Sequence, residues 1–557
     1  MSAQALVLNP ASPNKETCKK GRPTASYHPC LWKDHFLTHS SEFLKSDAIA
    51  QQEYEQLKQE VRRMLNDTNS DRLKKLHLID AVQLLGVDYH FEREIDDELE
   101  RISRDGAIDS DLYSVALWFR LLRQQGINVP SEVFKKFQDE NGKFKAELAD
   151  DVLGMLNLYE AAHLGLPGED ILDEAIAFTT SKLESISTQV SPQLAEQIAR
   201  ALNRPIRKNF PRLEARHYIS LYSRDDHFKS SNGALLRFAK IDFNMLQAFH
   251  QKELRSITEW WKKLDFTTKL PFARDRLVEC YFWIMDIYFE PKYAVARIFL
   301  TKVLILTSVM DDTFDNYGTH DELKLLTKCI ERWDISVIDE LPDYMKLFYQ
   351  ALLDIYSEIE KQVAKEGRSY AVHYAKESMK GVAKAYLVES KWREEGYIAP
   401  LEEYMKNGHF SSTYPMLITN SYVGMGNVAS KEAFDWISND PKMLVACTTI
   451  CRVMDDIVTH QFERERDHVY SVIESYMKVH GVSREETLKF FRKEIVNAWK
   501  VINEGCMKPT TFPMPLHTRI LNFTRAMDVV YKDDDAYTKS YLLKDQIASL
   551  LVDPVLV

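Results

Sequence analysis

Glycine and proline are scarce in this chain of 557 residues. The 18 glycines and 19 prolines make up about 7% of the chain against a usual share near 12%, which leaves few of the turns that many short strands would need. No uninterrupted apolar run approaches the roughly 18 residues of a membrane span, so no membrane-spanning helix is expected. The scarcity of turn residues favours an all-α fold. The length indicates two domains, because single cores stop growing at about 250–300 residues.

Positive charge is in the minority, and paired cysteine motifs are missing. The net charge of −11 and the pI near 5.9 argue against a nucleic-acid-binding protein, which needs a basic face for phosphates. An anionic ligand must therefore be met by a local cluster. The odd number of cysteines without a CxxC pair indicates free thiols in a reducing compartment: Cys18, Cys30, Cys280, Cys329, Cys447, Cys451 and Cys506.

The first 21 residues contain no arginine and no apolar core of a signal peptide. We interpret residues 1–21 as a disordered arm and residues 22–232 as an N-terminal helical domain. Within that domain, segments such as 112–122 and 152–164 carry apolar residues at helical spacing. Turn residues at 126–129, 139–143 and 166–168 separate the helices. The polar, breaker-rich segment 223–233 marks the predicted boundary with a second domain, residues 233–557.

A cluster of acids ends the most apolar helix of the second domain. This helix is expected to begin near Pro291, and its segment 302–310 is almost wholly apolar, as in a helix buried inside a bundle. Asp311 and Asp315 follow in a DDxxD pattern and share one helical face. Like charges repel there, and a helix C-terminus disfavours anions. A Mg²⁺ ion fits this chemistry, although an exposed acidic helix end has the same pattern.

A second polar stripe follows about 140 residues downstream. Asp455, Thr459 and Glu463 lie at i, i+4 and i+8, and again follow an apolar stretch. Two such motifs predict facing metal sites that hold one diphosphate from both sides. Arginines can clamp its oxygens bidentately, although by themselves they are more often surface residues. The candidates are Arg274, Arg276 and Arg452.

Four motifs together carry a family resemblance. DDTFD at 311–315, DDIVTHQFE at 455–463, RDR at 274–276 and RPTASYHPCLW at 22–32 resemble those of plant class I terpene synthases, and most of all cytosolic sesquiterpene synthases. The resemblance covers 22–557. It implies a C-terminal class I terpenoid synthase bundle and an N-terminal α-barrel-like helical domain. That first domain is expected to be catalytically silent, because the DxDD motif of type II cyclisation is replaced by EIDD at 94–97.

The resemblance also implies residue roles. Asp311 and Asp315 would bind two Mg²⁺ ions, Asp455, Thr459 and Glu463 a third, and Mn²⁺ can substitute. Asp312 would lie behind the ligands. Arg274, Arg276 and Arg452 would draw away the released diphosphate, and Trp283 would stabilise carbocations with its ring face.

Further positions match the substrate pocket and its lid. Thr413, Tyr414 and Leu417 match a helix that lines the pocket, and Tyr531, Asp535 and Tyr537 match the C-terminal lid. Two departures leave lid closure and the proton-handling role of Tyr531 open. The lid is one residue shorter between its tyrosines, with Ala536 in place of the common glycine, and Glu465 and Asp467 stand where lysine and glycine are usual.

The implied activity is that of a monomeric, cytoplasmic sesquiterpene synthase. Magnesium-dependent ionisation of farnesyl diphosphate, cyclisation of the cation and loss of a proton would release diphosphate and a cyclic sesquiterpene. The N-terminus favours this interpretation, since plastid-directed relatives carry long serine- and arginine-rich transit peptides. The alternatives are a monoterpene synthase using geranyl diphosphate and a noncatalytic prenyl-lipid binding protein. A prenyl chain elongase would instead carry a second DDxxD.

Overall fold

The computed structural model describes residues 27–38, 48–68, 70–108, 110–465 and 469–557, without the side chains of 48–50 and 461–465. The predicted arm, residues 1–21, lies outside the described residues. Within them, the regular structure is helical, and strand-like pairing is confined to one isolated bridge between Gln138 and Phe144. The prediction of an all-α fold is confirmed.

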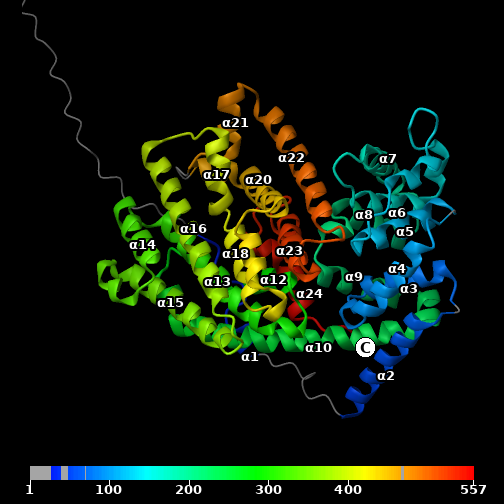
Figure 1. The fold of residues 1–557 in the computed structure, drawn as a ribbon, viewed down its shortest axis with the longest axis horizontal. Helices are drawn as coiled ribbons and strands as arrows, with labels where there is room; N and C mark the ends of the chain where they lie inside the picture. The colour runs from blue at the N-terminus through cyan, green and yellow to red at the C-terminus, as the bar shows by residue number, and fades with distance from the viewer. Residues whose placement is uncertain (1–26, 39–47, 69, 109, 466–468) are drawn as a thin grey trace, which may run out of the picture.

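The N-terminal helices form a compact group on one side of the molecule (Figure 1). The predicted helices at 112–122 and 152–164 are confirmed as α5 and α6, which pack on each other. The predicted break at 126–129 begins with Gly126, whose φ of 79° favours glycine. The helices are α2 (Ala48–Asn66), α3 (Arg72–Leu84), α4 (Glu92–Arg104), α5 (Leu112–Gln124), α6 (Val152–Ala162), α7 (Asp170–Ile186), α8 (Pro192–Asn203) and α9 (Pro211–Ser223).

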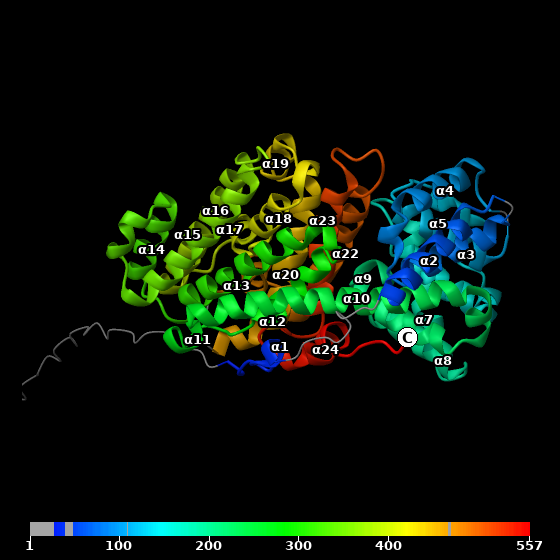
Figure 2. The ribbon, with the colours of Figure 1, turned by 90° about the horizontal axis from the view of Figure 1, so that it is seen from below.

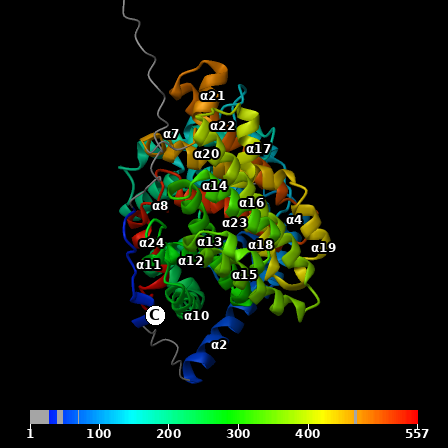
Figure 3. The same ribbon diagram turned by 90° about the vertical axis from the view of Figure 1, so that its left-hand side faces the viewer.

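The remaining helices form a larger bundle. Its middle is made by α12, α13, α18 and α23, which contact one another in a ring (Figure 3). The bundle helices are α10 (Asp226–Leu264), α11 (Phe266–Lys269), α12 (Leu277–Ile287), α13 (Ala294–Asn316), α14 (His320–Arg332), α15 (Asp343–Ala364), α16 (Tyr370–Glu395), α17 (Leu401–Ser411), α18 (Tyr414–Val423), α19 (Lys431–Ile437), α20 (Lys442–Glu465), α21 (Val472–His480), α22 (Arg484–Gly505), α23 (Met514–Val530) and α24 (Lys544–Leu551).

Helix α13 lies at the centre of this bundle. It begins at Ala294, close to the predicted start, and its last turns contain Asp311 and Asp315. Among the described residues, the stretch Pro291–Asn316 is long and apolar enough to cross a membrane. An 18-residue window of it has a mean hydropathy of 1.6, but 83% of that window is buried inside the protein. That burial is typical of a core helix.

The two groups of helices are joined by α10, which runs beneath both of them (Figures 1 and 2). The predicted boundary at 232/233 falls inside this helix, at Asn232, where the backbone leaves helical geometry (φ −132°, ψ 28°). The chain therefore passes from one group to the other through a kinked helix. The boundary itself stays a prediction. The short helix α1 (His35–Thr38) packs on α10, so residues near Trp32 lie against the bundle rather than in the N-terminal group.

Candidate active site

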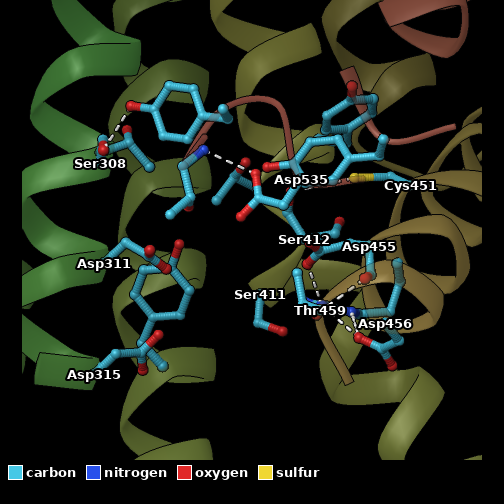
Figure 4. A pocket seen from close by; sticks show the side chains of 18 of the residues that line it. Ser308, Asp311, Asp315, Ser411, Ser412, Cys451, Asp455, Asp456, Thr459 and Asp535 are labelled. Atoms are coloured by element: carbon cyan, nitrogen blue, oxygen red, sulfur yellow. Dashed lines mark hydrogen bonds and ion pairs between the residues drawn. The ribbon is translucent and has the colours of Figure 1, made fainter. Parts of the chain in front are cut away.

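One wall of a cavity in the bundle is the end of α13. Asp311 and Asp315 both line this cavity, and Figure 4 shows them one above the other on the same helix face. At the C-terminal end of α13, Arg393 donates to the carbonyl oxygens of Phe314 and Asp315, each at 2.9 Å. A cation at this position satisfies the last carbonyls and offsets the concentration of negative charge.

The opposite wall is α20. Asp455 and Thr459 line the same cavity and face the α13 acids in Figure 4. The Thr459 hydroxyl donates to the Asp455 carbonyl at 2.9 Å, so its oxygen lone pairs remain available to a cation. Glu463 continues the stripe on α20, which is helical through Glu465. The side chain of Glu463, like those of Glu465 and Asp467, lies outside the described part of the chain.

Each wall pairs its first aspartate with an arginine. Arg274 donates from Nη2 to Asp311 Oδ2 at 2.6 Å and from Nη1 to Thr538 Oγ1 at 3.0 Å. Its backbone amide and Nε both donate to Asp312 Oδ2, at 2.7 and 3.2 Å. Asp312 is fully buried and also accepts a hydrogen bond from Tyr27 at 3.0 Å. Asp312 therefore holds the Arg274 guanidinium in position beside Asp311.

The α20 wall repeats this arrangement. Arg452 contacts Asp455 through Nη2 and donates from Nε to Asp456 Oδ1 at 2.7 Å. Asp456 is 1% exposed, and its other oxygen accepts from the Tyr404 hydroxyl at 2.7 Å and from the Val472 amide at 2.8 Å. Each wall therefore has two adjacent aspartates. The second of them, Asp312 or Asp456, holds an arginine against the first, Asp311 or Asp455.

The carboxylates of the α13 wall carry excess negative charge. Desolvation raises the pKa of the Asp311 carboxyl to about 7, the neighbouring charge of Asp315 adds to this rise, and Arg274 opposes it. Burial also raises the pKa of Asp312, against the lowering effect of Arg274. A divalent cation would relieve this repulsion, and hard carboxylate oxygens suit Mg²⁺.

The floor of the cavity is aromatic. The ring of Trp283 lies 6.5 Å from that of Tyr414, 6.1 Å from that of Tyr531 and 6.0 Å from that of Tyr537. Tyr414 donates its hydroxyl to the Phe523 carbonyl at 3.0 Å. All four rings line the cavity, where aromatic side chains can stabilise positive charge.

The lid is tied to the cavity wall by hydrogen bonds. Tyr537 donates to Ser308 Oγ on α13 at 2.7 Å, and Asp535 accepts from the Thr538 amide at 2.9 Å. This geometry holds the loop after α23 over the cavity despite the replacement of the usual glycine by Ala536. Ala536 donates its own amide to the Val530 carbonyl at 3.0 Å.

The structure does not bring Arg276 into the cavity, where the sequence places it beside the diphosphate. Its guanidinium is fully buried and donates to the backbone carbonyls of Tyr537 at 3.1 Å, Thr538 at 3.0 Å and His28 at 2.8 Å. With its donors used by carbonyls, Arg276 joins the lid to the chain near the N-terminus. The sequence motif contains no signal for these distant partners.

The other described candidates meet at one cavity. Its lining includes all predicted residues except Arg276 and the undescribed Glu463: Arg274, Trp283, Asp311, Asp315, Thr413, Tyr414, Leu417, Arg452, Asp455, Thr459, Tyr531, Asp535 and Tyr537. Several polar lining residues were not predicted from the sequence: Tyr27, Ser308, Asn316, Tyr386, Glu389, Tyr404, Ser411, Ser412 and Asp456. Of these, Asp456 had a usable signal, because it follows Asp455 as Asp312 follows Asp311.

No three His, Cys, Asp or Glu side chains in the described residues gather closely enough to hold a metal ion alone. Each wall instead offers one or two carboxylates across an open cavity. This is the donor set that Mg²⁺ uses when substrate phosphates supply further ligands. The described side chains therefore fit divalent metals that bind together with a diphosphate.

Comparisons with known proteins agree with this geometry. A family model described as "Terpene synthase, N-terminal domain" matches residues 31–202, and one described as "Terpene synthase family, metal binding domain" matches residues 262–501. The (-)-germacrene D synthase of Vitis vinifera is 52% identical over 559 residues, covering 100% of both chains. Valencene synthase of the same plant is 52% identical over 545 residues, covering 96% of this chain and 97% of its own.

A solved structure shows the same fold. Isoprene synthase from grey poplar leaves (Populus x canescens), in complex with three Mg²⁺ ions and dimethylallyl-S-thiolodiphosphate, superposes with a TM-score of 0.86 at 33% identity. The similarity covers 91% of this chain and 98% of that one. The chain belongs to the terpene synthase family.

Proposed function

We propose that this protein is a sesquiterpene synthase that converts farnesyl diphosphate into a cyclic sesquiterpene and diphosphate. The observation that carries the proposal is the pair of acid walls, α13 and α20, that face each other across a cavity with an aromatic floor. The names of the grapevine relatives, germacrene D synthase and valencene synthase, support a C15 substrate over geranyl diphosphate.

We infer that three Mg²⁺ ions act in the reaction and that Mn²⁺ can replace them. Asp311 and Asp315 would hold two ions, and Asp455, Thr459 and Glu463 the third. When bound, the ions neutralise the diphosphate so that the allylic carbon–oxygen bond breaks. The isoprene synthase structure, solved in complex with three Mg²⁺ ions, supports this number.

The arginines of the two walls bind the diphosphate as it leaves. Arg274 and Arg452 each contact an aspartate that would hold a metal ion, and each guanidinium would turn from that aspartate to the diphosphate once the aspartate was coordinated. Their planar guanidinium groups then donate two hydrogen bonds each to diphosphate oxygens. Asp312 and Asp456 hold both arginines at the walls while this exchange takes place.

The remaining lining controls the carbocation. Trp283 offers a ring face that stabilises positive charge, a contact worth about 0.5–2 kcal/mol. Leu417 and Met527 give the cavity apolar surface on which the C15 chain can fold. The loop from Tyr531 to Thr538 closes the cavity against water, which would otherwise quench the cation as an alcohol.

We further propose a cytosolic monomer whose N-terminal domain takes no part in the chemistry. The predicted ligands and arginines all lie between residues 274 and 463, outside α2–α9, which supports a structural role for α2–α9. Expression of a tagged full-length protein in plant cells tests the location, and sedimentation tests the oligomeric state. Plastid fluorescence or a dimeric mass would contradict the respective proposal.

The direct test is a comparison of substrates. Purified protein is incubated with the C10, C15 and C20 diphosphates and Mg²⁺, and the products are identified by gas chromatography with mass spectrometry. We expect a cyclic sesquiterpene and a higher kcat/KM for farnesyl than for geranyl diphosphate, since specificity is the ratio of these values. A ratio that favours the C10 substrate would make the protein a monoterpene synthase. Binding of prenyl diphosphate without release of diphosphate would make it a noncatalytic binding protein.

A further inference from the structure

A second cavity lies at the junction between the N-terminal helices and the bundle. It has a volume of about 370 Å³, far more than the roughly 10–15 Å³ needed to admit one water molecule. It is lined on one side by residues from α3 to α9 and on the other by α23 and the segment after α12. It shares no lining residue with the candidate active site. We call it the junction cavity.

Two arginines from opposite sides meet in the junction cavity. Arg207 belongs to the short helix η5 (Ile206–Lys208), and Arg525 belongs to α23. Arg525 donates from Nε to the Arg207 carbonyl at 3.0 Å and from Nη1 to Asn522 Oδ1 at 2.8 Å. Arg207 donates from Nε to Asn503 Oδ1 at 2.9 Å. Two like charges thus share one site.

Neither arginine forms an ion pair with a carboxylate in the described part of the chain. Arg207 is 4% exposed, and its Nη2 is buried without a hydrogen-bond partner. Burial and the charge of Arg207 lower the pKa of Arg525 to about 9. A buried charge is costly unless it is paired, so the pair of arginines lacks an anion.

The acids around the junction cavity do not supply that anion. Four of its lining carboxylates face other cations: Glu92 with Lys292 at 3.1 Å, Asp96 with Lys508 at 2.9 Å, Glu214 with Arg200 at 2.8 Å and Glu290 with Arg519 at 3.9 Å. Burial raises the pKa of Asp88, a fifth lining acid, to about 7. Asp286 lies near Arg525, but no hydrogen bond or ion pair joins the two side chains, and burial raises the pKa of Asp286 to about 8.

We propose that the junction cavity binds a small phosphate-type oxyanion between Arg207 and Arg525. Guanidinium groups match such oxygens with two parallel hydrogen bonds, and the unpartnered Nη2 of Arg207 supplies a donor. The bound anion joins a residue of the N-terminal domain to a residue of the bundle. It therefore stabilises the docked arrangement of the two domains more strongly as its concentration rises. Inorganic phosphate and inorganic diphosphate share this chemistry.

The test uses the full-length protein with EDTA, so that no divalent metal supports anion binding at the acid walls. Thermal unfolding is followed against increasing inorganic phosphate or inorganic diphosphate, with sodium chloride added to keep the ionic strength constant. We expect Tm to rise with at least one of the two anions, and to keep rising with the logarithm of concentration above Kd. A larger rise with diphosphate identifies the longer anion as the better ligand, and an equal rise identifies single phosphate as sufficient.

Variants locate the response. Arg207→Gln and Arg525→Gln should each weaken the apparent affinity at least tenfold. Arg204→Gln is the matched control, because Arg204 donates across the same junction to the Asp528 carbonyl at 2.9 Å but does not line the cavity. Arg452→Gln should keep the response, because Arg452 belongs to the active site. Calorimetric titration at 25 °C repeats the comparison for each variant whose circular dichroism shows native helicity.

Several outcomes would overturn the proposal. If the unmodified protein shows neither a rise in Tm with either anion nor saturable heat on calorimetric titration, the junction cavity holds only water. A response that survives both junction substitutions, or that Arg452→Gln abolishes, places the anion elsewhere. An equal loss in Arg204→Gln means that the substitutions act through general damage to the interface.

Discussion

Replacing Asp456 with asparagine tests whether the second aspartate of each wall positions an arginine. Asp456 has three donors around it: Arg452 Nε at 2.7 Å, the Tyr404 hydroxyl at 2.7 Å and the Val472 amide at 2.8 Å. Asparagine keeps the size of the side chain but loses its charge, and its amide nitrogen must face one of these donors. Arg452 keeps its contact with Asp455 but loses its hydrogen bond to a charged Asp456.

The size of the effect follows from the bond that is lost. A hydrogen bond to a charged group contributes about 1.5–3 kcal/mol, and each 1.36 kcal/mol changes a rate tenfold. We therefore expect kcat/KM of Asp456→Asn to fall by about ten- to 150-fold. Tyr404→Phe removes only one hydroxyl from Asp456, a loss of about 0.5–1.5 kcal/mol, and should lower kcat/KM about two- to tenfold.

Steady-state kinetics with farnesyl diphosphate measures these changes, and a Mg²⁺ titration accompanies each variant. Thermal unfolding and circular dichroism show whether the helices remain folded. Asp354→Asn, at an exposed position of α15, is the control for loss of one negative charge. The positioning role is refuted if Asp456→Asn keeps kcat/KM within twofold, or if its only defect is a lower Tm with normal kinetics at low temperature.

Four further substitutions test three other parts of the site. Asp311→Ala or Asp315→Ala should lower turnover about a hundredfold or more while helicity is retained, because each removes a hard oxygen ligand; wild-type rates in limiting Mg²⁺ would contradict the ligand assignment. Arg276→Met leaves buried carbonyls of the lid and N-terminal segment without donors, and gas chromatography should show more terpene alcohol; an unchanged product mixture would exclude a role in closure. Trp283→Leu should lower kcat about two- to 30-fold without changing the half-saturating Mg²⁺ concentration, and a changed metal requirement would place the defect elsewhere.

The acid walls are predictable from the sequence because their geometry is local. Helical spacing alone puts Asp311 and Asp315 on one face, and the apolar residues before them place α13 in the core. The same reasoning applies to Asp455 and Thr459 on α20. The packing of the helices decides whether the two walls face each other. Their facing arrangement could be inferred only from chemistry and family resemblance.

The role of Arg276 could not be predicted from its neighbours. The motif at 274–276 contains two arginines with equal claims on a diphosphate, and the backbone conformation decides which of them enters the cavity. Arg274 points to Asp311, whereas Arg276 points to carbonyls more than 240 positions away in sequence, such as that of His28. Long-range backbone partners leave no pattern in a single sequence.

The domain boundary shows a similar limit. Polar and breaker residues at 223–233 indicate a break in the chain, and the structure has two interruptions there: a turn at Arg224 and Asp225 between α9 and α10, and a kink at Asn232. After Asn232 the helix continues, and its buried residues from Leu235 to Trp261 pack along both groups. The local preference for a break is therefore visible in the structure, but local composition does not show that the chain resumes as a helix that contacts both groups.

The central claim is that the two acid walls act through divalent metal to ionise a C15 diphosphate. The most direct measurement follows diphosphate and sesquiterpene in the same reaction, with purified metal-free protein, farnesyl diphosphate and a titration of Mg²⁺. We predict no product with EDTA, and equimolar release of diphosphate and a cyclic hydrocarbon as Mg²⁺ is added. Hydrocarbon formation that persists with EDTA, or diphosphate release that yields only farnesol, would contradict the claim.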